Sequence, residues 1–190
     1  MSNTRSGLAM AMAIGLGITM AALTGCETSP GQAHAASVEP AELGDTDRVH
    51  VCGDVLLASQ PAEGDFATLR QQGYRSVLNL RHEREMNQLD FDQAEAITSQ
   101  GMHYYHVPVG GADELTDDVF DHVRQILNNP GNRPVLVHCA SANRVGAVWL
   151  AHRVLDAGVA YEDALAEAEQ VGLRSDALMH RARDYIDRHQ

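Results

Sequence analysis

The alternation of apolar and polar positions becomes regular at about residue 48. Short apolar runs bounded by turn residues predict five strands, at 48–52, 55–59, 75–80, 103–109 and 134–138. The first two flank the turn Gly53-Asp54, which is typical of a hairpin. The last, PVLVH, is apolar throughout, as expected of a strand that is buried on both faces at the centre of a sheet.

Helical periodicity separates and follows these strands. Apolar residues spaced three and four apart predict helices within 59–73, at 89–100, 116–128 and 143–157, and in two segments that begin near Tyr161 and Ser175. Strands that alternate with helices indicate an α/β domain. We therefore expect a central, mostly parallel sheet of four to five strands flanked by helices.

The N-terminal region lacks this periodicity. Residues 1–25 combine a cationic start at Arg5 with an apolar run and small residues, which is the composition of an export signal. Leu23-Thr24-Gly25-Cys26 resembles the lipobox of bacterial lipoproteins. A simple cleaved signal or an uncleaved anchor are the alternatives, but the run is short for a membrane-spanning helix.

The lipobox resemblance implies that Cys26 is lipidated and becomes the mature N-terminus. It places the protein on the periplasmic side of a bacterial membrane, anchored by lipid, and Glu27 after the cysteine favours the outer membrane. Residues 26–47 are rich in Ser, Pro, Gly and Ala and are expected to be a flexible linker. The folded domain would then span residues 48–190.

Charge excludes one class of partner. The chain has 14 Lys plus Arg, all of them arginine, against 26 Asp plus Glu, and its formal net charge is −12. Binding to phosphate backbones needs clustered cations, so nucleic acid is not expected as a partner.

Three cysteines are present, and two of them lie in the domain. Cys52 stands in an apolar segment and is expected to be buried as a small hydrophobic residue. A reversible Cys52–Cys139 disulfide remains an alternative in an oxidising compartment.

A loop that carries candidate reactive side chains follows the strand that is expected to be most buried. Cys139 stands at the carboxyl end of that strand, where ligands of open α/β sheets bind. Residues 140–143 lead into a helix whose first amides have no intrahelical partner and can cradle an anion. This field favours the ionised thiolate of Cys139, and the fork of Arg144 can grip two oxygens of an oxyanion. The combination suggests nucleophilic attack on a bound oxyanion.

The His138-Cys139-loop-Arg144-x-Gly146 arrangement resembles the signature loop of cysteine-dependent protein tyrosine and dual-specificity phosphatases, in particular a small bacterial branch. The strands ending in Asn79-Leu80-Arg81 and His106-Val107-Pro108-Val109 match the layout of the same family. The resemblance covers residues 48 to about 157. It implies a phosphatase fold and the hydrolysis of phosphate monoesters, on phosphotyrosine-like or small-molecule substrates, without a cofactor.

The resemblance also implies roles for individual residues. Cys139 attacks phosphorus, and an upstream Asp protonates the leaving oxygen. We assign that acid to Asp113, with Glu114 as a weaker rival, whereas a purely solvated Asp113 remains an alternative. The phosphoryl oxygens would be held by Arg144 and by the loop residues Ala140, Ser141, Ala142 and Asn143. His138 would orient the loop rather than carry a proton.

Two departures from the family pattern bear on activity. Four residues separate Cys139 from Arg144 where the family has five, and Val145 replaces the Ser or Thr that helps to expel the thiolate. We therefore expect a weak or specialised phosphatase. The short loop also leaves open a rhodanese-like sulfurtransferase with a Cys persulfide, and a catalytically inactive anion-binding module. No metal site is expected, because His103 and His106 face opposite sides of their predicted strand.

Overall fold

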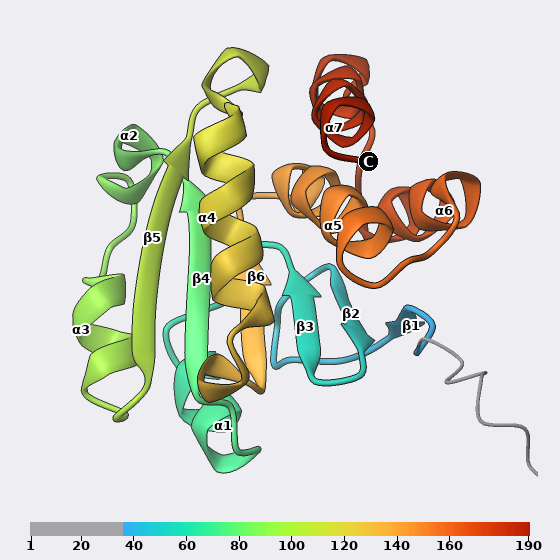
Figure 1. Cartoon of the computed structure of the whole chain (residues 1–190). Coiled ribbons are helices and arrows are strands. Elements are labelled where there is room, and N and C mark those ends of the chain that lie inside the picture. The colour runs from blue at the N-terminus through green and yellow to red at the C-terminus, as the bar shows by residue number, and fades with distance from the viewer. Residues whose placement is uncertain (1–35) are drawn as a thin grey trace, which may run out of the picture. The chain divides into compact units, whose positions relative to one another are not determined.

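The computed structural model describes residues 36–190 (Figure 1). The predicted signal peptide, the predicted lipidation site Cys26 and the first part of the predicted linker lie outside these residues. Within residues 36–190, no helix is long and apolar enough to cross a membrane.

The core of the domain is a six-stranded sheet in the order β1-β2-β3-β6-β4-β5. The strands are β1 (Glu39–Pro40), β2 (Val49–Cys52), β3 (Val55–Ala58), β4 (Ser76–Arg81), β5 (His103–Val109) and β6 (Val135–His138). β3, β6, β4 and β5 run parallel, β2 pairs antiparallel with β3, and β1 pairs antiparallel with β2 at the edge of the sheet. The predicted, mostly parallel sheet is confirmed, with β1 added to the expected strands.

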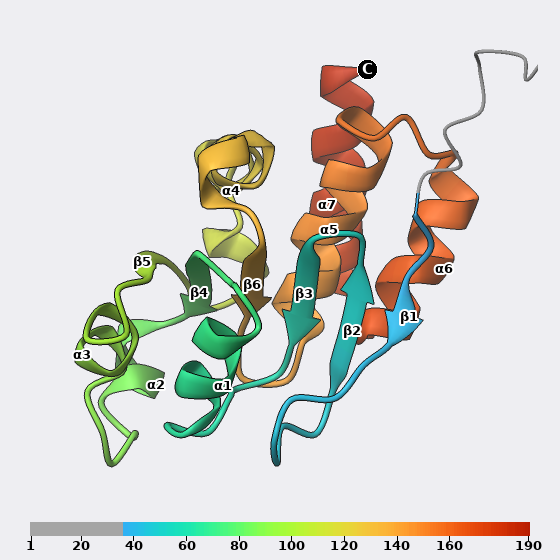
Figure 2. The same cartoon turned by 90° about the horizontal axis from the view of Figure 1, so that it is seen from below.

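Helices cover both faces of the sheet (Figure 2). One face carries α4 (Asp117–Asn128), α5 (Asn143–Leu155), α6 (Tyr161–Val171) and α7 (Asp176–His189), and the other carries α1 (Asp65–Gln71), α2 (Glu83–Met86) and α3 (Gln93–Thr98). Two short 3-10 turns, η1 (Ala112–Glu114) and η2 (Pro130–Asn132), flank α4. Because strand side chains alternate, Val135 and Val137 of β6 pack into one hydrophobic cluster and Leu136 into the other.

The folded domain begins upstream of residue 48, where the composition suggested a linker. Leu43 is only 2% exposed and belongs to the cluster under α1 and α3, and β1 pairs with β2. The Asp65 carboxylate at the start of α1 holds the segment against the domain, because it accepts a hydrogen bond of 2.9 Å from the Thr46 hydroxyl. Burial of these few apolar side chains, rather than periodicity, makes the segment part of the fold.

The helix predicted at 89–100 is shorter than expected. α3 begins after Asp92, whose side chain accepts a hydrogen bond from the Glu95 N–H, and it ends at Thr98. The preceding turn, α2, was not predicted. It is a four-residue helix capped by His82 and has no buried residue, so it lacks the apolar stripe that marks a helix in a sequence.

The alternative of a Cys52–Cys139 disulfide is wrong. Both thiols are free and buried. Cys52 pairs with Val55, and Val55 pairs with Val135 at the amino end of β6. Cys139 follows the carboxyl end of β6, roughly 13 Å further along at about 3.3 Å per residue. Disulfides need Cα atoms within about 7 Å.

Candidate active site

The sheet brings the ends of β4 and β6 together. The two strands are parallel, and Asn79 of β4 pairs with His138 of β6. Arg81, the last residue of β4, and Cys139, the residue after β6, therefore lie at the same edge of the sheet. This is the edge at which the sequence predicted a site.

Cys139 is fully buried, at 0% exposure. Its backbone N–H donates to the carbonyl of Ala58 on the neighbouring strand, at 3.4 Å. The sequence predicted a thiol at the floor of an anion pocket. The structure buries this thiol completely.

The loop that follows, Ala140–Asn143, makes the expected turn from strand into helix. Ala142 is buried and takes a left-handed conformation at φ 64°, directly before α5. The Asn143 side chain accepts hydrogen bonds from the backbone N–H groups of Arg174 and Ser175, at 3.0 and 3.3 Å. These two hydrogen bonds from the connection between α6 and α7 thus fix the position of the first residue of α5.

Gly146 explains the glycine in the Arg-x-Gly motif. A Cβ at this position would lie 2.7 Å from the carbonyl oxygen of Ala168 and 2.8 Å from the Cβ of Leu173. Only glycine allows α5 to pass this close to the end of α6. Val145, which stands in the place of the family's hydroxyl residue, is fully buried.

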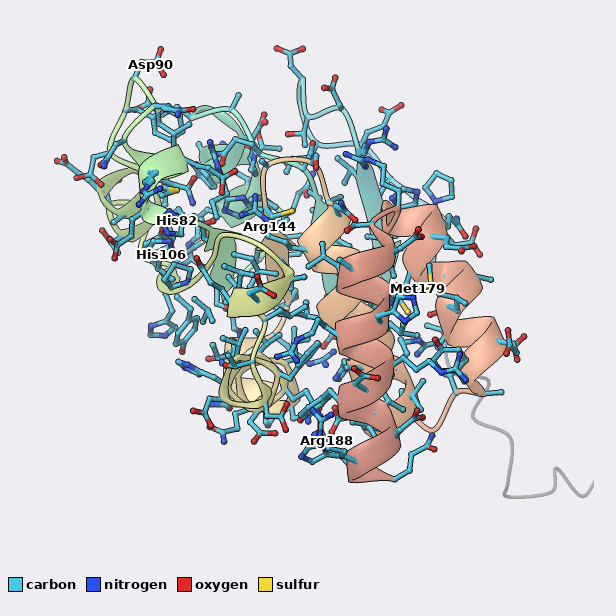
Figure 3. The ribbon with its side chains drawn as sticks, turned by 90° about the horizontal axis from the view of Figure 1, so that it is seen from above. His82, Asp90, His106, Arg144, Met179 and Arg188 are labelled. Carbon is cyan, nitrogen blue, oxygen red and sulfur yellow. The ribbon has the colours of Figure 1, made fainter. Side chains whose placement is uncertain are left out.

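Arg144 points into the site rather than into solvent. Its Nη1 donates to Glu85 Oε2 at 2.6 Å and to the Val109 carbonyl at 2.5 Å, and its Nη2 donates to Glu85 Oε1 at 2.8 Å. A guanidinium has five N–H groups in a fixed plane. These three bonds leave Nε–H and the second Nη2–H, which share one edge. His82, His106 and Arg144 lie on the same side of the molecule, as the view from above shows (Figure 3).

The interaction between Glu85 and Arg144 stabilises the charged forms of both side chains. The hydrogen bonds from Arg144 hold the pKa of the Glu85 carboxyl below its ordinary value. Burial lowers the pKa of Arg144, but the hydrogen bond to Glu85 and the electrostatic interaction with the Cys139 sulfur outweigh burial and raise it. Arg144 therefore stays charged, fixed by Glu85 on one edge and adjacent to the Cys139 sulfur.

A buried polar chain supports the loop from below. Arg81 Nη1 donates to Gln60 Oε1 at 2.6 Å, Gln60 Nε2 donates to Gln93 Oε1 at 2.9 Å, and Gln93 Nε2 lies 2.8 Å from His138 Nε2. The bond from Gln60 directs the Gln93 NH₂ group toward His138, so His138 Nε2 accepts. Burial lowers the pKa of His138 to about 3. His138 is therefore neutral, as a residue that orients the loop should be.

The two acids considered for proton donation occupy different places on η1. Asp113 is exposed. The Glu114 carboxylate accepts a hydrogen bond of 2.6 Å from the Gly110 N–H and lies 4.0 Å from His82 Nε2. Glu114 also lines a cavity of about 290 Å³ together with His82 and Glu85, and Asp113 is not among the residues that line it. The structure thus places Glu114 at a cavity that is also lined by Glu85, the partner of Arg144.

The two histidines weighed as metal ligands are apart. His103 is exposed, and His106 Nε2 lies 2.7 Å from the carbonyl oxygen of Arg81. Within residues 36–190, no three His, Cys, Asp or Glu side chains form a group that could hold a metal ion.

Sequence reasoning missed the partners of the site's arginines. Glu85, the partner of Arg144, lies between the predicted strand at 75–80 and the predicted helix at 89–100, and Gln60, which accepts from Arg81, had no predicted role. One signal was present for Glu85: it stands three residues after His82, and its carboxylate accepts from the His82 N–H as in a capping box. An acid fixed this close to the end of β4 faces the loop after β6.

Comparison with known families supports a phosphatase-type domain. The family model described as "DSP-PTPase phosphatase fused to NAD+ Kinase" matches residues 37–184. A "Beta-lactamase hydrolase-like protein" of Xylella fastidiosa is 33% identical over 104 residues, which make up 54% of this chain and 24% of the relative. The chain thus spans about a quarter of the length of the curated relatives it matches.

Solved structures share the fold at low sequence identity. TpbA of P. aeruginosa, in a complex with pTyr, has a TM-score of 0.61 at 18% identity, with 82% of this chain and 91% of that chain covered. The core catalytic domain of the PP-IP phosphatase SIW14 of S. cerevisiae, in complex with citrate, has a TM-score of 0.62 at 22% identity, with 80% and 90% covered.

Proposed function

We propose that this chain, which belongs to the DSP-PTPase phosphatase family, hydrolyses phosphate monoesters through a phosphoenzyme on Cys139. One observation carries this proposal: the Arg144 guanidinium, held by Glu85, interacts electrostatically with the Cys139 sulfur where the sheet passes into α5. A bidentate guanidinium and a thiol at that place suit a phosphoryl group between them.

The first step transfers the phosphoryl group to sulfur. The Cys139 thiolate attacks phosphorus, the S–P bond forms, and the P–O bond to the leaving group breaks. Arg144 and the amides of Ala140–Asn143 hold the three equatorial oxygens as charge spreads over them. In the second step water attacks phosphorus, inorganic phosphate leaves, and the thiolate returns.

The leaving oxygen needs a proton. Asp113 remains the acid that the family resemblance implies, and Glu114 is the second candidate because it lines the cavity beside Glu85. Replacing the true acid by its amide should depress kcat most for alkyl phosphates, whose leaving groups are poor. We therefore propose to compare Asp113→Asn with Glu114→Gln on an aryl and an alkyl phosphate. Equal loss across leaving groups in both variants would exclude both acids.

Turnover should be slow in its second step. Val145 offers no hydroxyl to stabilise the departing thiolate, and its side chain is fully buried. Ser141 is the nearest hydroxyl along the loop that could take this role. We expect a burst of product equal to the enzyme concentration, followed by slow release of phosphate.

Substrate access requires the site to open, because Cys139 is covered. α2 is the segment suited to move, since none of its residues is buried and Glu85 is its link to Arg144. Small aryl phosphates and phosphotyrosine-like groups are narrow enough to approach a deep thiol, so we propose them as substrates.

Phosphatase assays on matched variants test the proposal. With p-nitrophenyl phosphate, Cys139→Ser should abolish turnover, whereas Cys52→Ser, which alters the other buried free thiol of the described residues, should leave it unchanged. Full activity in Cys139→Ser would refute the Cys139 phosphoenzyme. Thiocyanate formation from thiosulfate and cyanide, without release of phosphate, would instead favour sulfur transfer.

We also propose that the protein is held on the periplasmic face of a bacterial membrane through lipid on Cys26. The proposal is based on the Leu23–Cys26 motif alone. Metabolic labelling with a radioactive fatty acid should tag the wild type and not Cys26→Ser. Label that persists in Cys26→Ser would exclude this cysteine as the lipidated residue.

A further inference from the structure

A second guanidinium lies next to the proposed phosphoryl site. Arg81 ends β4 beside the loop of Cys139, and it is only 7% exposed. Its Nη1 and Nη2 donate to Gln60 Oε1 and to the Glu85 carbonyl, at 2.6 and 3.0 Å. Its Nε is buried and has no hydrogen-bond partner. A buried N–H group without a partner is costly, and such a group calls for an explanation.

Arg81 and Arg144 face the same carboxylate. Glu85 Oε1 accepts from Arg144 Nη2 at 2.8 Å and lies 3.9 Å from Arg81 Nε, too far for a hydrogen bond. Two guanidinium groups thus meet one carboxylate beside the thiol. The excess positive charge suits a thiolate or a bound oxyanion.

Charge coupling supports this arrangement. Burial lowers the pKa of Arg81, and Arg144 adds to the lowering, whereas Glu85 and the Cys139 sulfur act in the opposite direction. Arg81 therefore interacts electrostatically with both residues that the phosphatase mechanism uses.

We propose that Arg81 is a second arginine ligand of the phosphoryl group, and that its Nε–H donates to a phosphoryl oxygen when substrate binds. This inference rests on the proposed function. It also bears on the length of the loop, because a loop that is one residue shorter than the family's offers one amide fewer. The Nε–H of Arg81 supplies a donor in its place.

A purely supporting role is the alternative. Arg81 begins the polar chain through Gln60 and Gln93 to His138, so its loss could disturb the loop without any contact to substrate. Gln60→Met breaks this chain and leaves Arg81 in place. Arg75→Met is the matched control, because Arg75 is an exposed arginine directly before the first residue of the same strand.

Oxyanion binding to the Cys139→Ser protein separates these roles. Titration with tungstate by calorimetry should show a Kd that rises roughly tenfold to hundredfold in Arg81→Met, the size expected for a hydrogen bond to a charged group. Gln60→Met should raise it by less than about threefold, and Arg75→Met should not change it. Equal weakening by Gln60→Met and Arg81→Met, or no weakening by Arg81→Met, would overturn the inference.

A spectroscopic measurement covers the case in which Arg81→Met does not fold. In the Cys139→Ser protein, the Arg81 Nε–H resonance, identified by its loss in Arg81→Lys, should shift and exchange more slowly with water on addition of tungstate. A resonance that stays unchanged while tungstate binds would overturn the role of Arg81 and leave the phosphatase proposal intact. No binding of tungstate to the Cys139→Ser protein would overturn both.

Discussion

His138 makes the stability of the domain depend on pH in a defined window. Its imidazole is fully buried, and burial lowers its pKa from 6.5 to about 3. In the unfolded chain the same imidazole takes up a proton below pH 6.5, whereas in the folded domain it does not. Protonation therefore favours the unfolded state, and stability falls as the pH decreases from about 6.5 toward 3.

The size of the effect follows from the two pKa values. Between pH 7 and pH 5 the unfolded imidazole goes from mostly neutral to almost fully protonated, while the folded one stays neutral. At about 1.4 kcal/mol per pH unit, His138 should cost about 2 kcal/mol of unfolding free energy over this interval. Glu85 and Asp156 also titrate abnormally, but their pKa values are lowered from 4.5 and 3.8, so their contribution is lost only below this window.

Urea unfolding followed by circular dichroism at pH 7 and pH 5 measures the effect. The wild type should lose about 2 kcal/mol more than His138→Gln, which cannot take up a proton. The pKa of His50 is also lowered by burial, but His50 is present in both proteins, so its contribution cancels. His103→Gln, at an exposed histidine, should behave as the wild type. If His138→Gln loses as much stability as the wild type, the neutral buried imidazole is refuted.

Three further substitutions test the site and its supports. Glu85→Gln removes the charge that holds Arg144 by bonds of 2.6 and 2.8 Å, so it should lower kcat/KM roughly tenfold and the free energy of unfolding by about 1–2 kcal/mol. Phosphatase kinetics and urea unfolding measure these effects, and unchanged kinetics would show that Arg144 needs no such partner. Gly146→Ala places a Cβ 2.7 Å from a backbone oxygen and should lower the free energy of unfolding by about 1–3 kcal/mol. The control Gly64→Ala, whose added Cβ has no atom within 4 Å, should change thermal stability little, and equal effects of the two variants would contradict the close helix contact. Leu43→Ala should lower the free energy of unfolding, measured in urea, by about 2–5 kcal/mol, because Leu43 is buried in the core. A loss below about 0.5 kcal/mol would restore the interpretation of this segment as a linker.

The strands and the long helices were predictable because their burial is periodic. β5 and β6 lie where their apolar runs predicted them, and α7 begins after Ser175, whose side chain accepts a hydrogen bond from the Leu178 N–H. The position of Cys139 after the most apolar strand predicted that it lies at the carboxyl edge of the sheet, and the structure places it there, after β6. These features depend on local patterns that a single sequence contains.

Other features depend on tertiary contacts that no local pattern records. The segment around Leu43 was assigned to a linker because β1 has only two residues and no alternation. α2 was missed because a four-residue helix has no apolar stripe. Glu85, the partner of Arg144, is one of 26 acidic residues, and only the spatial proximity of α2 and α5 distinguishes it from the others.

The length of the loop between Cys139 and Arg144 gains its meaning from how the loop is held. Ala142 takes a left-handed conformation that costs a non-glycine residue roughly 1–2 kcal/mol, and its Cβ would lie 3.1 Å from one built on Gly172. Asn143 is fixed by the backbone of the α6–α7 connection. A loop that is strained and held from outside cannot relax to present another amide to an oxyanion. The Nε–H of Arg81, which is buried without a partner on the neighbouring strand, is a donor that needs no change in the loop.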